Sequence, residues 1–437
     1  MPAEGWDEPF FREWKAARAL ESNSALESSS SLESSRAPGA LTPRTIGRSR
    51  ARSRLAVTRL GLGSGPAGRG LPVPALLVVG SKGKGTAVAA ASWALSSRAG
   101  LRVGTITSPP LRSNRERIRL DGRPLTPAQA GALADRTAAL LAALGPFDPA
   151  EGYLPPSGLF TLVGLAHLLE AGVQALVVEE GLGGLSDDVS LFDYDVVAAT
   201  QIFPEHTDVL GGSLAAVAAD LLGTITPDTR AVIAHPAQPA EARERLAAQP
   251  APVTEVQEEA TIARTNLAVG LAAARALCEV RALTAPRPPQ AHAPAQAQAP
   301  TPAQARAALS LPGRLSHHAH AGAEWIVDAA ISPPGVRAAL AHARAHLRPD
   351  FLVLAGFPDT KDVDACVDAL GGREALFVGA GSDYLRYDRL AGRGAVLDTA
   401  QAVARAERTG RDVLTVGTMS FAGAVLTALD APVGAWW

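Results

Sequence analysis

A predicted strand, a glycine-rich turn and a predicted helix follow one another from residue 76, and this order constrains the fold more than any other part of the chain. The apolar residues 76–79 (LLVV) predict a short buried strand, and the Ala-rich residues 87–97 predict a helix. Between them lie Gly80, Ser81, Lys82, Gly83, Lys84, Gly85 and Thr86. Glycines allow the backbone N–H groups of such a turn to point inward, and the helix N-terminus adds positive potential. The arrangement is therefore typical of a loop that binds phosphate.

All seven residues of this turn are candidate nucleotide contacts. Lys84 would reach the β- and γ-phosphates, and Thr86 would lie beside the phosphates or a Mg²⁺ ion. Gly85 separates Lys84 from Thr86, so the match to the common GxxxxGK[ST] pattern is imperfect. An ordinary glycine-rich turn between strand and helix is the other interpretation, and the flanking strand and helix favour phosphate binding over it.

Composition narrows the class of protein. The chain has 437 residues, of which 47% are apolar, and its 41 Lys+Arg nearly balance its 43 Asp+Glu. This balance argues against a partner that is a nucleic acid or a membrane surface. Two cysteines, Cys278 and Cys366, are too few for a disulfide framework, which favours a reducing cytoplasm. Apolar runs are too short to span a membrane.

Strands and helices alternate from residue 76 to residue 234. The predicted strands are residues 76–79, 102–106, 175–178, 196–202 and 231–234, and the predicted helices between them are residues 87–97, 125–144, 158–171 and 214–222. This alternation predicts an α/β fold with a doubly wound, mostly parallel sheet. Ligands of such sheets bind at the carboxyl ends of the strands, and the polar clusters of this chain follow its predicted strands.

Shifts in composition divide the chain into four parts. Residues 1–47 combine a predicted helix (6–20) with a Ser/Glu-rich segment (21–35) that we expect to be disordered. Residues 48–282 form the predicted central domain, which ends in a predicted helix at 262–280. Residues 283–303 are rich in Pro, Ala and Gln and are predicted to be a linker. Residues 304–437 carry four short apolar segments, which predict a smaller Rossmann-like α/β domain. Those predicted strands are residues 325–327, 351–354, 375–378 and 413–416.

Six short motifs occur in a fixed order along the chain. They are the glycine loop, TSPPL at 107–111, RERIR at 115–119, EEGLGG at 179–184, EHTD at 205–208 and LPGR at 311–314. This order resembles the folylpolyglutamate synthase/dihydrofolate synthase branch of the Mur ligase family, over residues 55–429. The resemblance implies a P-loop central domain and an ATP-dependent amide ligase. Such an enzyme adds glutamate to a folate-type carboxylate through an acyl phosphate.

The resemblance also implies roles for single residues. Ser108, Glu179 and His206 match the positions that hold Mg²⁺ in the family, and with Lys84 the last two are the predicted catalytic residues. Three further residues match nucleotide contacts: Asn266 with the adenine, Arg314 with phosphate, and Asp328 from the second domain. The site would then lie between the two domains. The expected cofactors are ATP and Mg²⁺, and the expected partners are a folate-like acid and glutamate. We expect a cytoplasmic monomer.

The chain departs from the family pattern at several positions. The family motif EVGLGG reads EEGLGG here, and Pro110 replaces the His of TSPH. Ile331 and Ser332 replace the His and Asn of DGAHNP. Leu221 stands where the family has a carbamylated lysine that holds a second Mg²⁺, and we expect its side chain next to the phosphates. Two alternatives therefore stay open, namely a non-catalytic nucleotide-binding paralogue and a ligase for another acid.

Overall fold

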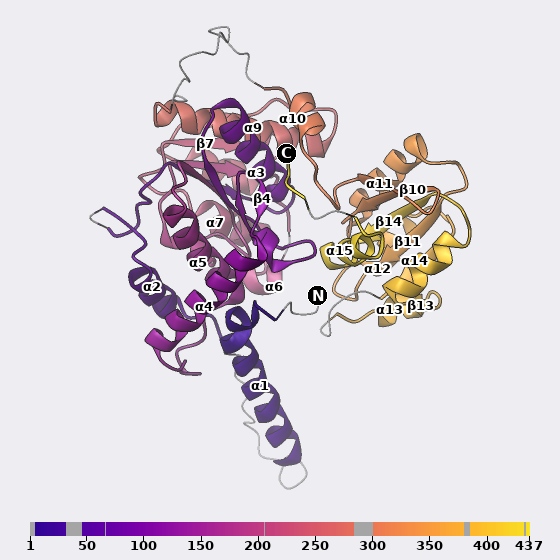
Figure 1. Ribbon diagram of the computed structural model, residues 1–437, viewed down its shortest axis with the longest axis horizontal. Coiled ribbons are helices and arrows are strands. Elements are labelled where there is room, and N and C mark those ends of the chain that lie inside the picture. Colours follow the sequence, from indigo (N-terminus) through magenta and orange to yellow (C-terminus); the bar gives the residue numbers. More distant parts are fainter. Residues whose placement is uncertain are drawn as a thin grey trace. The chain divides into compact units, whose positions relative to one another are not determined.

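The computed structural model (Figure 1) describes residues 5–31, 46–65, 67–204, 206–283, 300–379, 385–431 and 434–437, with the backbone alone for residues 23–31 and 208. The described chain forms two compact units. The central unit consists mainly of Ala3–Ser108 and Arg117–Leu309, and the C-terminal unit mainly of Pro109–Glu116 and Ser310–Trp436.

The central unit is built on an eight-stranded sheet with the order β4-β3-β2-β5-β1-β6-β7-β8. Its strands are β1 (Ala75–Val79), β2 (Val103–Ile106), β3 (Ile118–Leu120), β4 (Arg123–Pro124), β5 (Ala175–Glu179), β6 (Val196–Ala199), β7 (Ala231–Ala234) and β8 (Val253–Glu255). The strands from β2 to β8 in this order are parallel, and β3 pairs antiparallel with both β2 and β4. The predicted doubly wound, mostly parallel sheet is confirmed.

Every residue of β1, β5, β6 and β7 is buried, because helices cover both faces of this sheet. The helices are α1 (Glu8–Ser31), α2 (Arg50–Arg59), α3 (Lys84–Trp93), α4 (Pro127–Leu144), α5 (Pro156–Glu170), α6 (Thr207–Leu210), α7 (Leu214–Leu222), α8 (Ala240–Ala247), α9 (Ile262–Val280) and α10 (Pro302–Ala308). Helices α3 and α9 pack against each other and against β1. Gly270 makes this contact close, since a Cβ atom there would collide with the carbonyl oxygen of Ala87.

The edge hairpin β3–β4 is absent from the prediction. Its turn is Asp121-Gly122, and both residues have positive φ angles, 47° and 73°. An Asp-Gly pair with this geometry is a strong hairpin signal. The strands escaped detection because they are only three and two residues long.

The C-terminal unit has a six-stranded sheet with the order β13-β12-β11-β14-β10-β9. Its strands are β9 (Ser316–His320), β10 (Ala323–Asp328), β11 (Leu352–Gly356), β12 (Ala375–Val378), β13 (Val396–Leu397) and β14 (Val413–Gly417), and its helices are α11 (Pro333–His346), α12 (Val363–Asp368), α13 (Asp388–Ala391), α14 (Thr399–Glu407) and α15 (Met419–Ala428). All neighbouring strands are parallel except β9, which pairs antiparallel with β10. The four predicted strands are confirmed, and the edge strands β9 and β13 are additions.

Two predictions at the segment boundaries need correction. The part of the Ser/Glu-rich segment up to Ser31 is helical, because α1 continues through it, and residues 32–35 lie outside the described residues. An ion pair of 2.6 Å between Arg18 and Glu21 supports this continuation. The predicted linker, residues 283–303, lies largely outside the described residues, but its end is helical. There Thr301 and Gln304 form a capping box at the start of α10.

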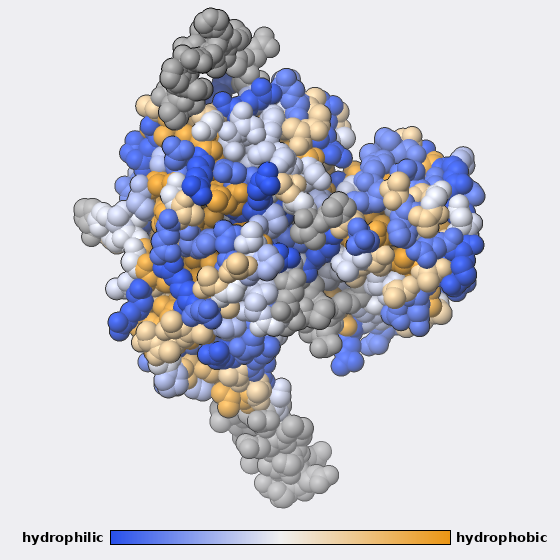
Figure 2. Space-filling model, in the orientation of Figure 1, coloured by the Kyte–Doolittle hydropathy of each residue, from blue (hydrophilic) through white to orange (hydrophobic). Residues whose placement is uncertain are grey.

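The surface of the described residues mixes hydrophilic and hydrophobic side chains on the face shown in Figure 2. Among these residues, none of the helices combines the length and the apolar character that crossing a membrane requires. The large apolar side chains are mainly inside, where Trp325, Tyr194 and Phe10 are almost completely buried.

Candidate functional site

Four neighbouring strands bring the predicted site segments together at their carboxyl-terminal ends, which form the carboxyl edge of the central sheet. Strands β2, β5, β1 and β6 lie side by side and run parallel. Ser108 follows β2, Glu179 ends β5, the loop 80–86 follows β1, and His206 follows β6. Because parallel strands end at the same edge, the topology places these segments together, as the sequence predicts.

The glycine loop needs glycine at two positions. Gly80 has a φ angle of 128°, and a Cβ atom there would collide with the hydroxyl of Thr200. Gly83 has a φ angle of 92°, and a Cβ atom there would collide with the side-chain amide of Asn266. Side chains avoid such φ angles, so both the backbone and its surroundings select glycine. The predicted nucleotide residue Asn266 thus lies directly against the loop.

The hydroxyl of Ser81 holds the loop in place. It donates a hydrogen bond to the carbonyl oxygen of Phe203 at 2.9 Å and accepts one from the Phe203 N–H at 3.0 Å. This pair of bonds ties the loop to the segment that follows β6. Gly83 is the N-cap of helix α3, and its carbonyl oxygen accepts the N–H groups of Thr86 and Ala87.

Lys84, the first residue of α3, is turned back over the loop. Its ammonium group donates to the carbonyl oxygen of Gly80 and forms an ion pair of 2.9 Å with Glu180 Oε1. The side chains of Lys84 and Glu180 are 13% and 2% exposed. The loop therefore holds its cation next to a buried carboxylate.

Glu179, the neighbour of Glu180, faces the start of α3. Both of its carboxylate oxygens would lie 3.6 Å from a Cβ atom at Gly85. The backbone N–H of Ser108 donates to Glu179 Oε2 at 3.2 Å, so two of the three predicted metal ligands are in contact. Carboxylate and hydroxyl oxygens are donors that Mg²⁺ accepts, and their position beside a phosphate loop fits that ion.

Arg117 lies beside the same two residues. It donates to Ser108 Oγ at 3.0 Å and covers the ring of Phe160 at 5.0 Å. Burial lowers the pKa of its guanidinium to about 10, while Glu179 and Asp7 oppose that shift. Arg117 belongs to the RERIR motif, but the motif comparison did not predict it as a site residue.

His206 has a different setting from Ser108 and Glu179. It is exposed, has a φ angle of 47° and precedes the short helix α6. Strand order brings it to the same edge of the sheet, and its role as a metal ligand stays a prediction. The acidic neighbour Glu205 lies outside the described residues, as does the side chain of Asp208.

Asn266 Oδ1 and His235 Nε2 are buried polar atoms without a hydrogen-bond partner among the described residues. Asn266 lies near the start of α9, and His235 lies directly after β7. His235 Nδ1 accepts the N–H of Ala237 at 3.1 Å, which leaves its proton on Nε2 as a donor. Burial lowers the pKa of His235, which favours its neutral form. His235 was not among the predicted site residues. Its position as a polar residue directly after a predicted buried strand was the available signal.

The C-terminal unit contains the other two predicted nucleotide residues. Arg314 donates to the sulfur of Met419 at 2.7 Å, and Asp328 accepts the N–H of Leu315 at 2.8 Å. The carbonyl oxygen of Gly313 accepts the N–H of Ala329. The structure therefore brings the LPGR turn and the end of β10 together within this unit.

Solved structures with the same architecture identify the fold. The folylpolyglutamate synthase of Mycobacterium tuberculosis, complexed with ADP and AMPPCP, superposes with a TM-score of 0.72 at 22% identity, covering 88% of this chain and 96% of that one. The Escherichia coli enzyme FolC, in complex with DHPP and ADP, gives a TM-score of 0.69 at 23% identity, covering 92% and 96%. The fold is that of the folylpolyglutamate synthases.

Sequence comparison agrees with this fold. The chain is 32% identical over 212 residues to the dihydrofolate synthase/folylpolyglutamate synthase of M. tuberculosis, and 28% identical over 188 residues to that of E. coli. These matches cover 45% and 42% of this chain, and 43% and 42% of the two relatives. The chain thus matches less than half the length of these relatives. No protein-family model matches the chain. The predicted resemblance to folylpolyglutamate synthases and dihydrofolate synthases is confirmed.

The surroundings of Leu221 bear on one departure from this family. Its side chain is 1% exposed and belongs to the hydrophobic core of the central unit, and its place next to the phosphates stays a prediction. In helix α7, Val217, Ala218, Leu221 and Leu222 are all buried. This spacing is that of an apolar helix face, which explains why Leu221 points inward.

The neighbour of Leu221, Asp220, organises the loop after β5. Its Oδ1 accepts the N–H of Gly184 at 2.6 Å, and its other oxygen accepts the hydroxyl of Ser186. Asp187 holds the same loop by accepting the N–H groups of Leu182 and Val189, each at 3.1 Å. Burial, with help from the charge of Asp188, raises the pKa of Asp187 to about 6. The carboxylates in this loop therefore serve its fold.

Proposed function

We propose that the chain is an ATP-dependent carbon–nitrogen ligase that joins the amino group of glutamate to a folate-type carboxylate. The observation that carries this proposal is the glycine loop with Lys84 at the carboxyl edge of the sheet, facing Glu179 and Ser108. Relatives named folylpolyglutamate synthase or dihydrofolate synthase, and solved relatives with bound ADP, support this choice of reaction.

Each residue of the edge has a task in this reaction. Lys84 would neutralise the phosphates, and the backbone N–H groups of the loop would position them. Asn266 Oδ1 can accept a hydrogen bond from the adenine amino group, and His235 Nε2 can donate to a ring nitrogen or a ribose oxygen. The two orphaned atoms therefore fit a nucleoside.

Three residues would hold the metal ion: Ser108, Glu179 and His206. A solved relative is complexed with AMPPNP and Mn, and we propose Mg²⁺ here. When bound, this ion neutralises charge on the transferring phosphoryl group. Arg117 adds a second positive charge beside Ser108, which favours an anionic substrate at this edge.

The proposed reaction has two steps, phosphoryl transfer and amide formation. An oxygen of the folate-type carboxylate attacks the γ-phosphorus, the bond to ADP breaks, and an acyl phosphate forms. The glutamate amine then attacks the acyl carbon, inorganic phosphate leaves, and the amine loses a proton to give the amide. We infer that this takes place in the cytoplasm, on a monomer, with small molecules as the only partners.

Phosphate release tests the proposal. We expect purified protein to release phosphate from MgATP only when two substrates are present together, namely glutamate and an acid that is either dihydropteroate or a reduced folate. Mass spectrometry should then find a product that carries one more glutamyl residue than the acid. Phosphate release with other acids would make the chain a ligase for another acid. Nucleotide binding without phosphate release across the panel would overturn the proposal in favour of a non-catalytic paralogue.

The ion pair between Lys84 and Glu180 predicts an unusual mutant. In the wild type, phosphate competes with Glu180 for the ammonium group of Lys84, and the family motif has valine at this position. Glu180→Gln keeps the shape of the side chain but removes its charge. We therefore expect MgATP to bind about tenfold more tightly, since a charge-assisted hydrogen bond contributes about 1.5–3 kcal/mol.

Isothermal titration calorimetry measures this change directly. Glu244→Gln, an exposed position on α8, is the matched control and should bind MgATP as the wild type does. Equal or weaker binding by Glu180→Gln would show that Glu180 does not compete with phosphate for Lys84.

A further inference from the structure

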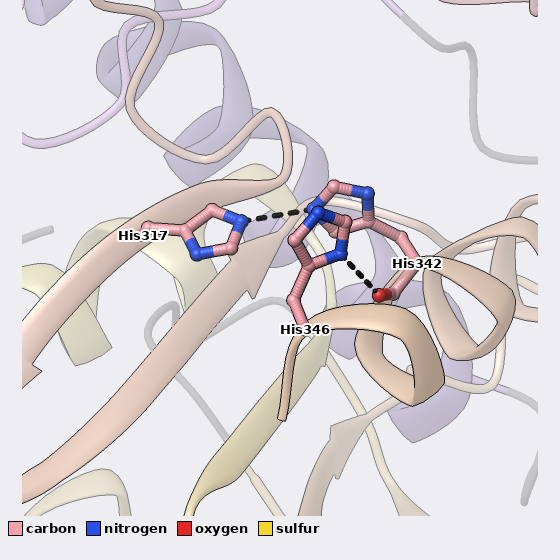
Figure 3. Close-up of side chains that lie close together, drawn as sticks. All are labelled: His317, His342 and His346. Atoms are coloured by element: carbon pink, nitrogen blue, oxygen red, sulfur yellow. Dashed lines mark hydrogen bonds between the residues drawn. The ribbon is translucent and has the colours of Figure 1, made fainter. Parts of the chain in front are cut away.

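Three histidines form a cluster in the C-terminal unit, on elements that none of the roles above uses. His317 lies on the edge strand β9, and His342 and His346 lie on α11. The four-residue spacing on α11 puts the last two on one face of the helix, and Figure 3 shows all three rings gathered there. Each ring offers one nitrogen such that the three nitrogens lie within 4.8 Å of one another.

The distances suit a tetrahedral metal ion. Two imidazole nitrogens bound to one Zn²⁺ at about 2.0–2.1 Å lie about 3.4 Å apart. His317 Nε2 and His342 Nε2 are 2.9 Å apart, and the rings of His342 and His346 are stacked with centroids 4.1 Å apart. Small side-chain rotations therefore bring the three nitrogens to metal distance.

The tautomer of His346 supports the same reading. Its Nδ1 lies 2.8 Å from the carbonyl oxygen of His342, and because a carbonyl only accepts, Nδ1 carries the proton. The lone pair is then on Nε2, which is free to coordinate. Histidine ligands of metals commonly donate their other N–H to a backbone carbonyl in this way.

We propose that His317, His342 and His346 bind one divalent transition cation of the Zn²⁺ class, with water in the fourth position. Imidazole nitrogens favour such ions over Mg²⁺, which takes oxygen ligands, so this site is separate from the proposed nucleotide metal. The ion ties β9 to α11. Among the described strands, β9 pairs with β10 alone, so this tie would stabilise an edge strand of the sheet.

Metal titration of the tag-free, full chain tests the proposal. After dialysis against a chelator, the wild type should bind one equivalent of Zn²⁺ in calorimetry and should give the intense visible bands of four-coordinate Co²⁺. His317→Gln and His346→Gln should each weaken Zn²⁺ binding by at least about tenfold and remove those bands. Zn²⁺, but not Mg²⁺, should raise the melting temperature of the wild type but not of these two variants.

His320→Gln is the matched control, because His320 lies on the same strand but bonds to Glu407 at 2.7 Å, outside the cluster. It should bind Zn²⁺ as the wild type does. Unchanged Zn²⁺ affinity in both cluster variants, or no binding by the wild type at millimolar Zn²⁺, would overturn the proposal. Neither outcome bears on the ligase reaction, which phosphate release tests separately.

Discussion

Lys84→Ala is expected to lose MgATP affinity by more than tenfold and to abolish ATP-dependent ligation. The substitution removes a charge-assisted phosphate contact, which contributes about 1.5–3 kcal/mol. It also leaves the carboxylate of Glu180 without its ion pair in a site where its side chain is 2% exposed. That buried negative charge would repel the phosphates, so the loss should exceed the value of the contact alone.

A double variant separates these two causes. In Lys84→Ala combined with Glu180→Gln, the repulsion is gone but the phosphate contact is still missing. We expect calorimetry to find MgATP affinity between those of Lys84→Ala and the wild type, with ligation still absent. Wild-type affinity in Lys84→Ala would remove the glycine loop from the nucleotide site.

Local signals were enough to predict most elements of the central unit. Helix α9 spans Ile262–Val280, the same residues as predicted, because its apolar periodicity is unbroken. Helix α4, Pro127–Leu144, lies within the predicted residues 125–144, and Thr126 and Gln129 form a capping box at its start. The order of strands in the sheet then brings Ser108 and Glu179 together. The hydrogen bond between them was not predictable from the sequence.

Interactions between distant residues set the limit of prediction. The ion pair between Lys84 and Glu180 joins the start of α3 to the residue after β5, far apart in the sequence, and no periodicity in the sequence predicts it. The orphaned ring nitrogen of His235 is likewise a property of its surroundings. The edge strand β9 was missed because its sequence, SHHAH, is polar and half exposed, whereas strand prediction relies on apolar residues.

Leu221 shows a different limit, because the signal for its burial was present in the sequence. Val217, Ala218, Leu221 and Leu222 have the spacing of a buried helix face, but the motif comparison suggested a position beside the phosphates. Matching a family position assigns the place of a backbone atom. It does not decide where a side chain of different chemistry points.

This burial turns Leu221→Lys into a test of stability. Lysine would place an ammonium group in the core where a 1% exposed leucine now packs, and the carboxylate of the preceding residue, Asp220, already accepts the N–H of Gly184. We expect the free energy of unfolding to fall by about 3–5 kcal/mol and the melting temperature by roughly 10 °C. Bicarbonate should not raise ligation by this variant, because a carbamate would be a charged group buried among apolar side chains.

Leu221→Met is the matched control, since it conserves the volume of the side chain and should cost less than about 1.5 kcal/mol. Calorimetric melting of the wild type and both variants, with phosphate release measured with and without bicarbonate, gives the full comparison. A Leu221→Lys variant that melts like the wild type and gains ligation with bicarbonate would place this side chain beside the phosphates after all. The second metal of the family would then be recoverable in this chain by one substitution.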